Sequence, residues 1–331
     1  MVAIRNIRPD EHPVVLDLVT AEIRPPGSET GPADDFPIAL GRDNLEGIFG
    51  VIAEGNVVAC LATLVRPFLT SVGRLEVAGI GSVVTHPDHR GNGHSRRLQE
   101  AVLDHLCQRG VPLAVLWSDH PEYYAGRGFV EAGVEYHLDL ATWRPTERAL
   151  SAGFVVRRYQ TSDVTAISDL HAACSYRTVR RDGEAKQLYD MPGTEGWVLV
   201  DAEQTLQAYL FCGKGADFPR YGLEWGGDPA TLTRLLAQVH GSGVERWLLA
   251  PQGAKPLRDL LQQQSAGCRA FPSGLWKVLN VDLLRAGAAA ANTDMPPDGA
   301  EGVHAWLGRV DPDGSVHEGQ CKLAVWGFDS V

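Results

Sequence analysis

Along residues 1–150, segments with the apolar pattern of a strand alternate with segments in which apolar residues recur at helical spacing. Together these segments predict a domain of mixed strands and helices. Residues 48–67 contain two apolar runs that meet in a turn at Gly55, which is the pattern of a β-hairpin. Residues 74–87 form another apolar run interrupted by a proline near its end, and we expect a strand there. From residue 93 to residue 109 the apolar positions recur at helical spacing, which predicts an amphipathic helix.

The remainder of this domain predicts two more strands around a short helix. The sequence VPLAVLWS at residues 111–118 has the pattern of a buried strand, and PEYYAGRG at residues 121–128 predicts a short helix or turn. The sequence FVEAGVEYHLDL at residues 129–140 then closes the domain as its last strand. Strands that alternate with helices in this way indicate an α/β (α+β) fold with a mixed sheet.

The following part of the chain repeats this pattern. The segment beginning at residue 155 matches the segment beginning at residue 3, and both predict a strand, a turn and an amphipathic helix. The hairpin beginning at residue 197 likewise matches the hairpin beginning at residue 49. We therefore predict two tandem units with mixed sheets, of which the second is degenerate.

These patterns predict three parts of the chain. The first domain covers residues 1–150 and the second covers residues 151–280. Residues 281–331 begin with small and turn-forming residues, which predict a linker, and continue as two apolar segments around a Pro-Asp-Gly turn. We expect this last part to form a short C-terminal β-hairpin extension.

Composition narrows the possible functions. The formal net charge is −11, which disfavours nucleic-acid binding because phosphate contacts need clustered Lys and Arg. The six cysteines show no C-x-x-C spacing, so we expect reduced thiols and no metal site. The chain contains no apolar run of membrane-spanning length, and we expect a cytoplasmic protein that does not bind membranes.

The segment HPDHRGNGHSRRL at residues 86–98 is the strongest candidate for chemistry. It joins a predicted strand to a predicted helix, and glycines before a helix N-terminus let unpaired N–H groups approach an anion. The turn is lined by Gly91, Asn92, Gly93, His94 and Ser95, with Arg90 and Arg96 adding positive charge for a diphosphate. A Walker loop and a dinucleotide-binding loop both need other spacings. A simple turn with helix-capping glycines remains the alternative.

Two motifs in this domain resemble those of the GNAT superfamily of N-acetyltransferases. Its acyl-CoA motif is an apolar strand, a proline, and then Arg-Gly-x-Gly-x followed by Ala, Gly or Ser, which opens a helix. It is filled here by Val83, Val84, Thr85, Pro87, Arg90, Gly91, Gly93 and Ser95. The sequence YYAGRGF at residues 123–129 resembles the second signature of the family. The resemblance covers residues 1–145 and implies acetyl-CoA as the co-substrate, with no metal.

The resemblance also implies a role for each matching residue. The N–H groups of residues 91–96 hold the CoA pyrophosphate, and the backbone of Val83 and Thr85 pairs with the pantetheine arm, which Ser118 also contacts. Tyr124 protonates the leaving thiolate after a neutral amine attacks the thioester. Glu76 is the candidate general base, with Asp119 and His120 as alternatives.

The tandem arrangement resembles the enhanced-intracellular-survival type of acetyltransferase. That resemblance implies a cationic amine acceptor, such as an aminoglycoside or a peptidyl lysine, and a C-terminal carboxylate near the active site, which would be that of Val331. Two other functions stay open at this stage. In the first, the chain is a sensor that binds acyl-CoA without turnover. In the second, the second unit serves only to form a homo-oligomer.

Overall fold

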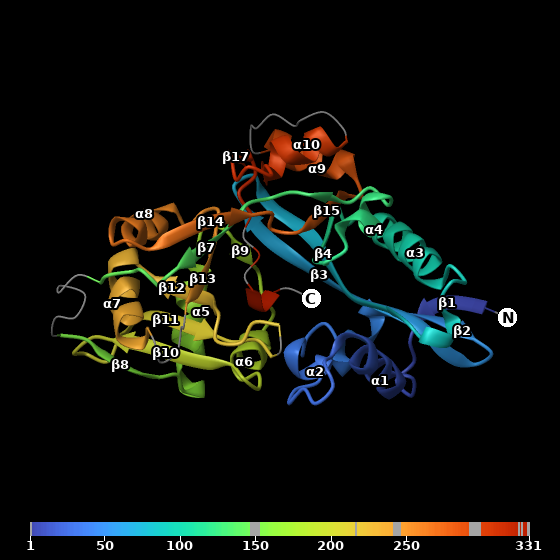
Figure 1. Ribbon diagram of the computed structural model, residues 1–331, viewed down its shortest axis with the longest axis horizontal. Helices are drawn as coiled ribbons and strands as arrows, with labels where there is room; N and C mark the ends of the chain where they lie inside the picture. Colours follow the sequence, from blue (N-terminus) through green and yellow to red (C-terminus); the bar gives the residue numbers. More distant parts are fainter. Residues whose placement is uncertain are drawn as a thin grey trace.

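Two large β-sheets, each covered by helices, form two lobes joined along the middle of the molecule (Figure 1). The computed structural model describes residues 2–145, 153–215, 217–240, 246–290, 299–323, 325 and 327–329. Within these residues the structure shows the predicted mixed α/β architecture with two similar units.

The first sheet has eight strands. In spatial order they are β1 (Val2–Asn6), β2 (Ile48–Ala53), β3 (Asn56–Thr70), β4 (Gly73–Thr85), β5 (Leu113–Leu116), β15 (Leu275–Val278) and β6 (Val130–Glu131), while β9 (Arg177–Thr178) pairs with β3. Its helices are α1 (His12–Ile23), α2 (Pro32–Asp35), α3 (His94–Gln108) and α4 (Pro121–Ala125). The predicted hairpin, strand and amphipathic helix are therefore β2–β3, β4 and α3.

The second sheet has seven strands and repeats the same order. Its strands are β14 (Gly267–Phe271), β7 (Glu135–Asp139), β13 (Trp247–Pro251), β12 (Gly222–Gly227), β11 (Leu206–Cys212), β10 (Glu195–Val200) and β8 (Val155–Arg158). Its helices are α5 (Val164–Ala172), α6 (Glu184–Tyr189), α7 (Pro229–Val239) and α8 (Lys255–Gln263). By position, β12, α7 and β13 correspond to β4, α3 and β5 of the first unit.

The two sheets exchange one strand each. Strand β7, from the first half of the chain, lies between β13 and β14 in the second sheet, and β15, from the second half, lies between β5 and β6 in the first. The sequence assigned each of these strands to its own unit, and the structure corrects that assignment. The boundary predicted at residue 150 therefore divides the chain but does not separate the sheets.

The two exchanged segments touch where they pass between the sheets. The N–H of Ala132 donates to the carbonyl of Gly274 at 3.1 Å, and the N–H of Ser273 donates to the carbonyl of Ala132 at 3.2 Å. Gly133 has a φ of +74°, and a Cβ there would lie 2.0 Å from the Ser273 hydroxyl. Only glycine fits this crossing, because both the conformation and the space exclude a side chain.

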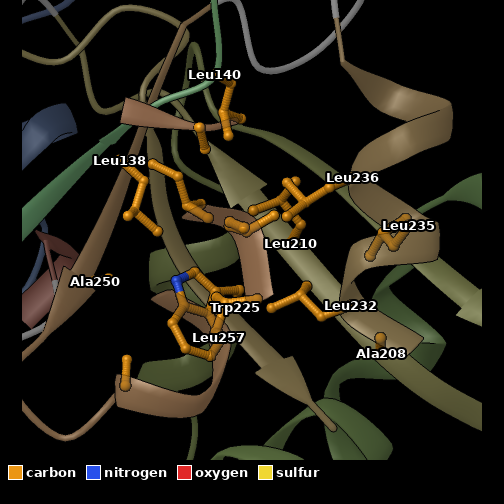
Figure 2. Packing of buried hydrophobic residues seen from close by; sticks show 14 of the residues in the cluster. Leu138, Leu140, Ala208, Leu210, Trp225, Leu232, Leu235, Leu236, Ala250 and Leu257 are labelled. Atoms are coloured by element: carbon orange, nitrogen blue, oxygen red, sulfur yellow. The ribbon is translucent and has the colours of Figure 1, made fainter. Parts of the chain in front are cut away.

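Packing in the second lobe shows why β7 is held there. Leu138 and Leu140 are fully buried in one cluster with Leu210 and Leu236 (Figure 2). Burying one leucine side chain contributes about 1.5–3 kcal/mol, so the first half of the chain stabilises the core of the second lobe directly.

Buried charges also join the lobes. Arg180 donates to Glu224 and to Asp329 at 3.0 Å, and the side chains of both acids are fully buried. Asp329 belongs to a helical turn, η5 (Gly327–Asp329), that lies between the lobes (Figure 1). A second ion pair joins Arg66 of β3 to Glu184 of α6.

The C-terminal part differs from its prediction. The expected linker begins as a helix, α9 (Val281–Ala290), and the first apolar segment is largely helix α10 (Ala300–Leu307). The expected hairpin is present but short, with β16 (Gly308–Val310) and β17 (Val316–Glu318) around the Pro-Asp-Gly turn. Trp306 and Leu307 of α10 pack against the first sheet together with Trp276, and that burial favours a helix over an extended strand.

All six cysteines are free thiols, at positions 60, 107, 174, 212, 268 and 321. Within the part of the chain that the structure describes, no helix is long and apolar enough to cross a membrane, and no cluster of His, Cys, Asp or Glu has the geometry of a metal site.

The strand exchange predicts that a residue late in the sequence stabilises the first lobe. Trp276 of β15 is 1 % exposed between β5 and β6. We expect Trp276→Ala to lower the free energy of unfolding by about 3–5 kcal/mol, because it leaves a large cavity. Hydrogen exchange should locate the lost protection in β5 and β6. The control Val155→Ala removes an exposed side chain, and it should change stability by less than about 0.5 kcal/mol.

Candidate active site

Strands β4 and β5 separate at their carboxyl ends. They pair in parallel only where Val77, Ala78 and Gly79 face Leu113, Ala114 and Val115. Strand β5 ends at Leu116, whereas β4 continues to Thr85. Within the described residues, the edge of β4 beyond Gly79 therefore has no partner strand on this side, and its backbone groups are available to an extended ligand.

A β-bulge bends β4 within this unpaired stretch. Ser82 has a φ of +53°, and the register with β3 shifts there, since Gly81 faces Ala62 but Val84 faces Cys60. A bulge re-aims the residues that follow it, and such positions are frequent beside functional sites. Val83 and Thr85, the expected pantetheine-binding residues, and Val84 between them lie directly beyond it.

The glycine-rich loop leaves the N-terminus of α3 open. Gly91 and Gly93 have φ values of +78° and +70°, and Gly93 is the N-cap, so no side chain caps the helix. A Cβ on Gly93 would have no heavy atom within 4 Å other than those of its neighbours, so the glycine is required by its conformation rather than by crowding. The first N–H groups of α3 therefore face outward with the positive end of the helix dipole.

Side chains of the loop hold it in this shape. Arg97 donates to the carbonyl of Asn92 at 3.1 Å and lies 3.1 Å from Nδ1 of His94. The Asn92 amide donates to the carbonyl of His89 at 3.1 Å. Burial, together with Arg97 and His89, lowers the pKa of His94, which favours its neutral form. Arg97 was not singled out from the sequence, because it lies beyond the matched motif.

Arg90 connects the loop to the rest of the domain. Its guanidinium forms an ion pair with Glu22 of α1, and its Nε donates to the carbonyl of Thr85 at 3.3 Å. Arg96 pairs with Glu100 one helical turn further on, and both side chains are exposed. Of the two arginines expected to attract a diphosphate, Arg90 therefore also positions the loop.

The start of α3 is tied to α4 by hydroxyl groups. The hydroxyls of Ser95 and Tyr123 are 2.9 Å apart, and Gln99 donates to Ser95 at 2.9 Å and to Tyr123 at 3.3 Å. This contact fixes the short helix that carries Tyr124. Sequence reasoning missed Tyr123 and Gln99, although Tyr123 stands beside a residue that it did select.

Tyr124 lies at the edge of the core of the first lobe. It is 9 % exposed, and its ring packs edge-on against Tyr123 and Phe129, with centroids 5.0 Å and 6.0 Å away. Its hydroxyl makes no hydrogen bond within the residues that the structure describes. Burial raises the pKa of Tyr124, so the phenol keeps its proton at neutral pH.

A basic pocket of about 390 Å³ lies between α3 and the end of α4. It is lined by Arg96, Arg127 and Lys277, together with Glu100. Lys277 belongs to the exchanged strand β15 and donates to the carbonyl of Arg127. Because Lys277 is far from the motif in sequence, only the strand exchange reveals its contribution.

A second cavity, of about 420 Å³, lies between the lobes and begins where β5 ends. Trp117, Ser118 and Asp119 follow β5 and form one wall. The other walls carry acidic, aromatic and polar residues from both halves of the chain, namely Phe36, Glu135, His137, Asp217, Phe218 and Tyr221, and the backbone at Gly327 closes it.

The acidic residues of this cavity differ in whether they are paired with another side chain. Asp217 pairs with Arg24 at 3.1 Å, and Glu135 lies 2.9 Å from His137. Asp119 has no hydrogen bond or ion pair to any other residue in the described ranges. Carboxylates beside aromatic rings suit a cationic ligand.

The other candidate bases lie elsewhere. Glu76 is near the start of β4, facing Pro67 and 3.9 Å from Arg74. It lies three residues before Gly79, where the pairing of β4 with β5 ends, and it is not among the residues that line the cavity. His120 is exposed and lies 3.7 Å from Glu122. The carboxylate of Val331 lies outside the described residues. Of the predicted bases, Asp119 is the one that lines the cavity.

The equivalent helix of the second lobe is closed to anions. Asp228 is the N-cap of α7, and its carboxylate accepts the N–H groups of Ala230 and Thr231 at 3.0 Å and 3.1 Å. A carboxylate occupies the position that an anion would take, and a phosphate would meet its negative charge.

Comparison with known sequences finds a family model that matches the first domain. Residues 3–132 match the model of the acetyltransferase (GNAT) domain. This range contains the loop, the unpaired edge of β4 and Tyr124. No curated protein matches the chain in sequence.

Solved structures share the fold across both units. A probable N-acyltransferase from Enterococcus faecalis superposes with a TM-score of 0.63 at 16 % identity, covering 86 % of this chain and 74 % of its own. A GCN5-related N-acetyltransferase from Anabaena variabilis gives 0.61 at 16 %, covering 86 % and 74 %. Eis1 from Mycobacterium abscessus gives 0.61 at 12 %, covering 87 % and 76 %. At these identities the likeness concerns the fold.

Because the N-terminus of α3 is open, adding one methyl group at Gly93 should affect the binding of CoA. We expect Gly93→Ala to weaken CoA binding at least 10-fold in calorimetry, because alanine disfavours a φ of +70° and shifts the N–H groups. The matched control is Gly55→Ala, in a remote turn with a φ of +87° and equally open space. Both variants should lose roughly 1–2 kcal/mol of stability. Equal CoA affinity in the two would contradict the anion site.

Proposed function

We propose that this chain, whose residues 3–132 form an acetyltransferase domain of the GNAT type, transfers the acetyl group of acetyl-CoA to a primary amine by direct attack. The observation that carries the proposal is the meeting of three features at one place. The unpaired edge of β4 begins after Gly79 and leads into the loop before the uncapped N-terminus of α3, and the acidic cavity begins where β5 ends. The contact of Ser95 with Tyr123 ties the start of α3 to α4, the helix that follows this cavity wall in the chain.

CoA binding is supported by the charge and the shape of the first domain. The N–H groups of residues 91–96 receive the pyrophosphate at the start of α3. The basic pocket formed by Arg96, Arg127 and Lys277 continues from there and suits a further phosphate of the same ligand. Because the carboxylate of Asp228 occupies the corresponding position in the second lobe, the proposal assigns CoA to the first lobe alone.

The pantetheine arm lies along β4 in this proposal. Its amides pair with the backbone of Val83 and Thr85, beyond the bulge at Ser82. Ser118, on the opposite side of the gap, borders the arm where it reaches the cavity. The thioester then stands at the mouth of the cavity between the lobes.

Tyr124 is the proton donor for the leaving sulfur. Attack by the amine nitrogen forms a carbon–nitrogen bond and breaks the carbon–sulfur bond, which leaves a thiolate. The phenol of Tyr124 remains protonated because burial raises its pKa, and it therefore has a proton to donate. Tyr123, held by Ser95 and Gln99, keeps α4 in place.

The acceptor enters from the cavity between the lobes. Its acidic and aromatic walls suit a small cationic amine, and Asp119 is free to pair with an ammonium group. An aminoglycoside-like amine and the side chain of a lysine both have this chemistry. The second lobe supplies walls of the acceptor site in this proposal.

Turnover by wild-type protein and Tyr124→Phe tests the proposal. We expect thiol release from acetyl-CoA with at least one of aminoglycosides, polyamines, amino acids or lysine peptides. Tyr124→Phe should reduce kcat by about 10²–10⁴-fold, the usual effect of removing a general acid, and bind CoA as tightly as wild type.

Tyr159→Phe is the matched control, because it removes a hydroxyl that bonds Asp190 in the second lobe, away from the proposed site. It should leave kcat unchanged. Tight CoA binding without turnover on any amine would contradict the enzyme and favour a sensor of acyl-CoA.

Substitution of Asp119 tests whether the acceptor binds as a cation. We expect Asp119→Asn to raise KM for a diamine roughly 3-fold to 10-fold, since one partly exposed ion pair contributes about 1 kcal/mol. KM for acetyl-CoA should not change. The control Asp259→Asn removes a surface carboxylate that pairs with Lys255 in the second lobe. An unchanged KM for cationic amines in Asp119→Asn would contradict this binding mode.

A further inference from the structure

Three residues of the acceptor cavity form a continuous hydrogen-bonded chain. Nε2 of His137 lies 2.9 Å from Oε1 of Glu135, and Nδ1 of the same ring is hydrogen-bonded to the hydroxyl of Tyr221. All three residues line the cavity. Glu135 and His137 are on the exchanged strand β7, whereas Tyr221 directly precedes β12, so the chain of bonds exists only because of the exchange.

The partners determine where the protons lie. A carboxylate only accepts hydrogen bonds, so Nε2 of His137 carries the hydrogen that Glu135 accepts. In the neutral ring Nδ1 is then unprotonated, and the Tyr221 hydroxyl donates to it. Burial together with Glu135 and Asp139 raises the pKa of Tyr221, which keeps this hydroxyl protonated. The arrangement is that of a base oriented by a carboxylate.

The surroundings hold the imidazole in place. The ring of Phe271 packs against His137 with centroids 4.5 Å apart, and the ring of Tyr221 lies edge-on at 5.6 Å. Asp139, the nearest other acid on the same face of β7, is occupied by Arg246 at 2.7 Å. Glu135 is therefore the carboxylate that compensates a charge on His137.

We propose that Tyr221, His137 and Glu135 form a proton relay that deprotonates the acceptor amine, with Tyr221 as the residue that touches the substrate. The inference rests on the proposed acetyl transfer and adds the proton acceptor that it requires. Among the sequence-derived candidates, Glu76 does not line the cavity, and Asp119 has no partner in the described ranges to pass a proton to.

The proton balance is complete with these groups. An N–H proton of the acceptor ammonium moves to the Tyr221 oxygen while the Tyr221 hydroxyl proton moves to Nδ1 of His137, and Glu135 compensates the imidazolium. The neutral nitrogen then attacks the thioester carbon, and the sulfur leaves with the proton of Tyr124. The second nitrogen proton, lost as the amide forms, restores Tyr124. His137 releases its proton to solvent.

The position of the relay agrees with this sequence of steps. The cavity that holds the relay is also lined by Trp117, two residues after Val115, the last residue of β5 that pairs with β4. An amine held by Asp119 is in the same cavity as Tyr221. In this proposal the relay acts on the acceptor side of the thioester. Tyr124, which follows Trp117 and Asp119 in the chain, acts on the sulfur.

The test compares three variants with the wild-type chain on the amine that turns over. We expect His137→Gln and Tyr221→Phe each to lower kcat by about 10²–10⁴-fold, with KM for acetyl-CoA unchanged. Glu135→Gln should lower kcat less. The loss should be larger for strongly basic amines than for weakly basic ones, because weakly basic amines are already neutral at the assay pH.

The control is His317→Gln. His317 lies 2.8 Å from Asp311 in the C-terminal hairpin, so it is also a histidine beside a carboxylate, but it is remote from the cavity. It should keep wild-type kcat. Thermal unfolding of each variant separates loss of catalysis from loss of fold, and a variant that is inactive but unfolded is replaced by His137→Asn.

The outcomes separate the relay from the proposed function. Absence of turnover in the wild type would overturn acetyl transfer itself. Turnover in the wild type that persists in folded His137→Gln, or that falls equally for strongly and weakly basic amines, would overturn the relay and leave acetyl transfer standing.

Discussion

The exchange of β7 and β15 between the two sheets is the constraint on which the rest of the structure depends. Each sheet is completed by a strand from the other half of the chain, and the exchanged strands contribute fully buried side chains to the cores they enter. Neither core can be completed without both halves, so the lobes are joined by their interiors rather than by a surface contact alone. The exchange also sets Glu135 and His137 in one cavity with the residues that follow β5, and it brings Lys277 beside Arg127. The lining of the cavity between the lobes and part of the basic pocket are consequences of it.

Buried charges complete the join at the end of the chain. Burial alone would raise the pKa of Asp329, but the Arg180 guanidinium holds it below its ordinary value. Burial lowers the pKa of Lys214 to about 7, and its ammonium nitrogen lies 2.9 Å from the carbonyl of Gly327. Breaking a buried ion pair by removing one partner destabilises a protein by about 3–5 kcal/mol. These contacts therefore specify one position for the helical turn η5, which closes the cavity between the lobes.

The two units share a framework and differ in one local feature with a large electrostatic effect. At the start of α3 a glycine leaves the helix N-terminus open, whereas at the start of α7 the carboxylate of Asp228 accepts the same N–H groups. The helix dipole is similar in both, so the difference in anion binding comes from the capping residue. One copy of the fold thus keeps an open helix N-terminus, and the other contributes Phe218 and Tyr221 to the wall of the cavity between the lobes.

The sequence by itself determined the features that depend on neighbouring residues. The hairpin around Gly55, the strand β4, the helix α3 and the glycine-rich loop follow from turn chemistry and apolar periodicity, and the internal repeat disclosed the second unit. The tertiary structure alone decided which sheet each of the exchanged strands β7 and β15 joins. The alternation of apolar and polar residues along β7 would be satisfied equally in either sheet. It alone also brought His137 to Tyr221, left Glu76 outside the lining of the cavity between the lobes, and made α10 a helix against the first core. Periodicity specifies which face of a segment is buried, but the partner that buries it is chosen by packing over the whole chain.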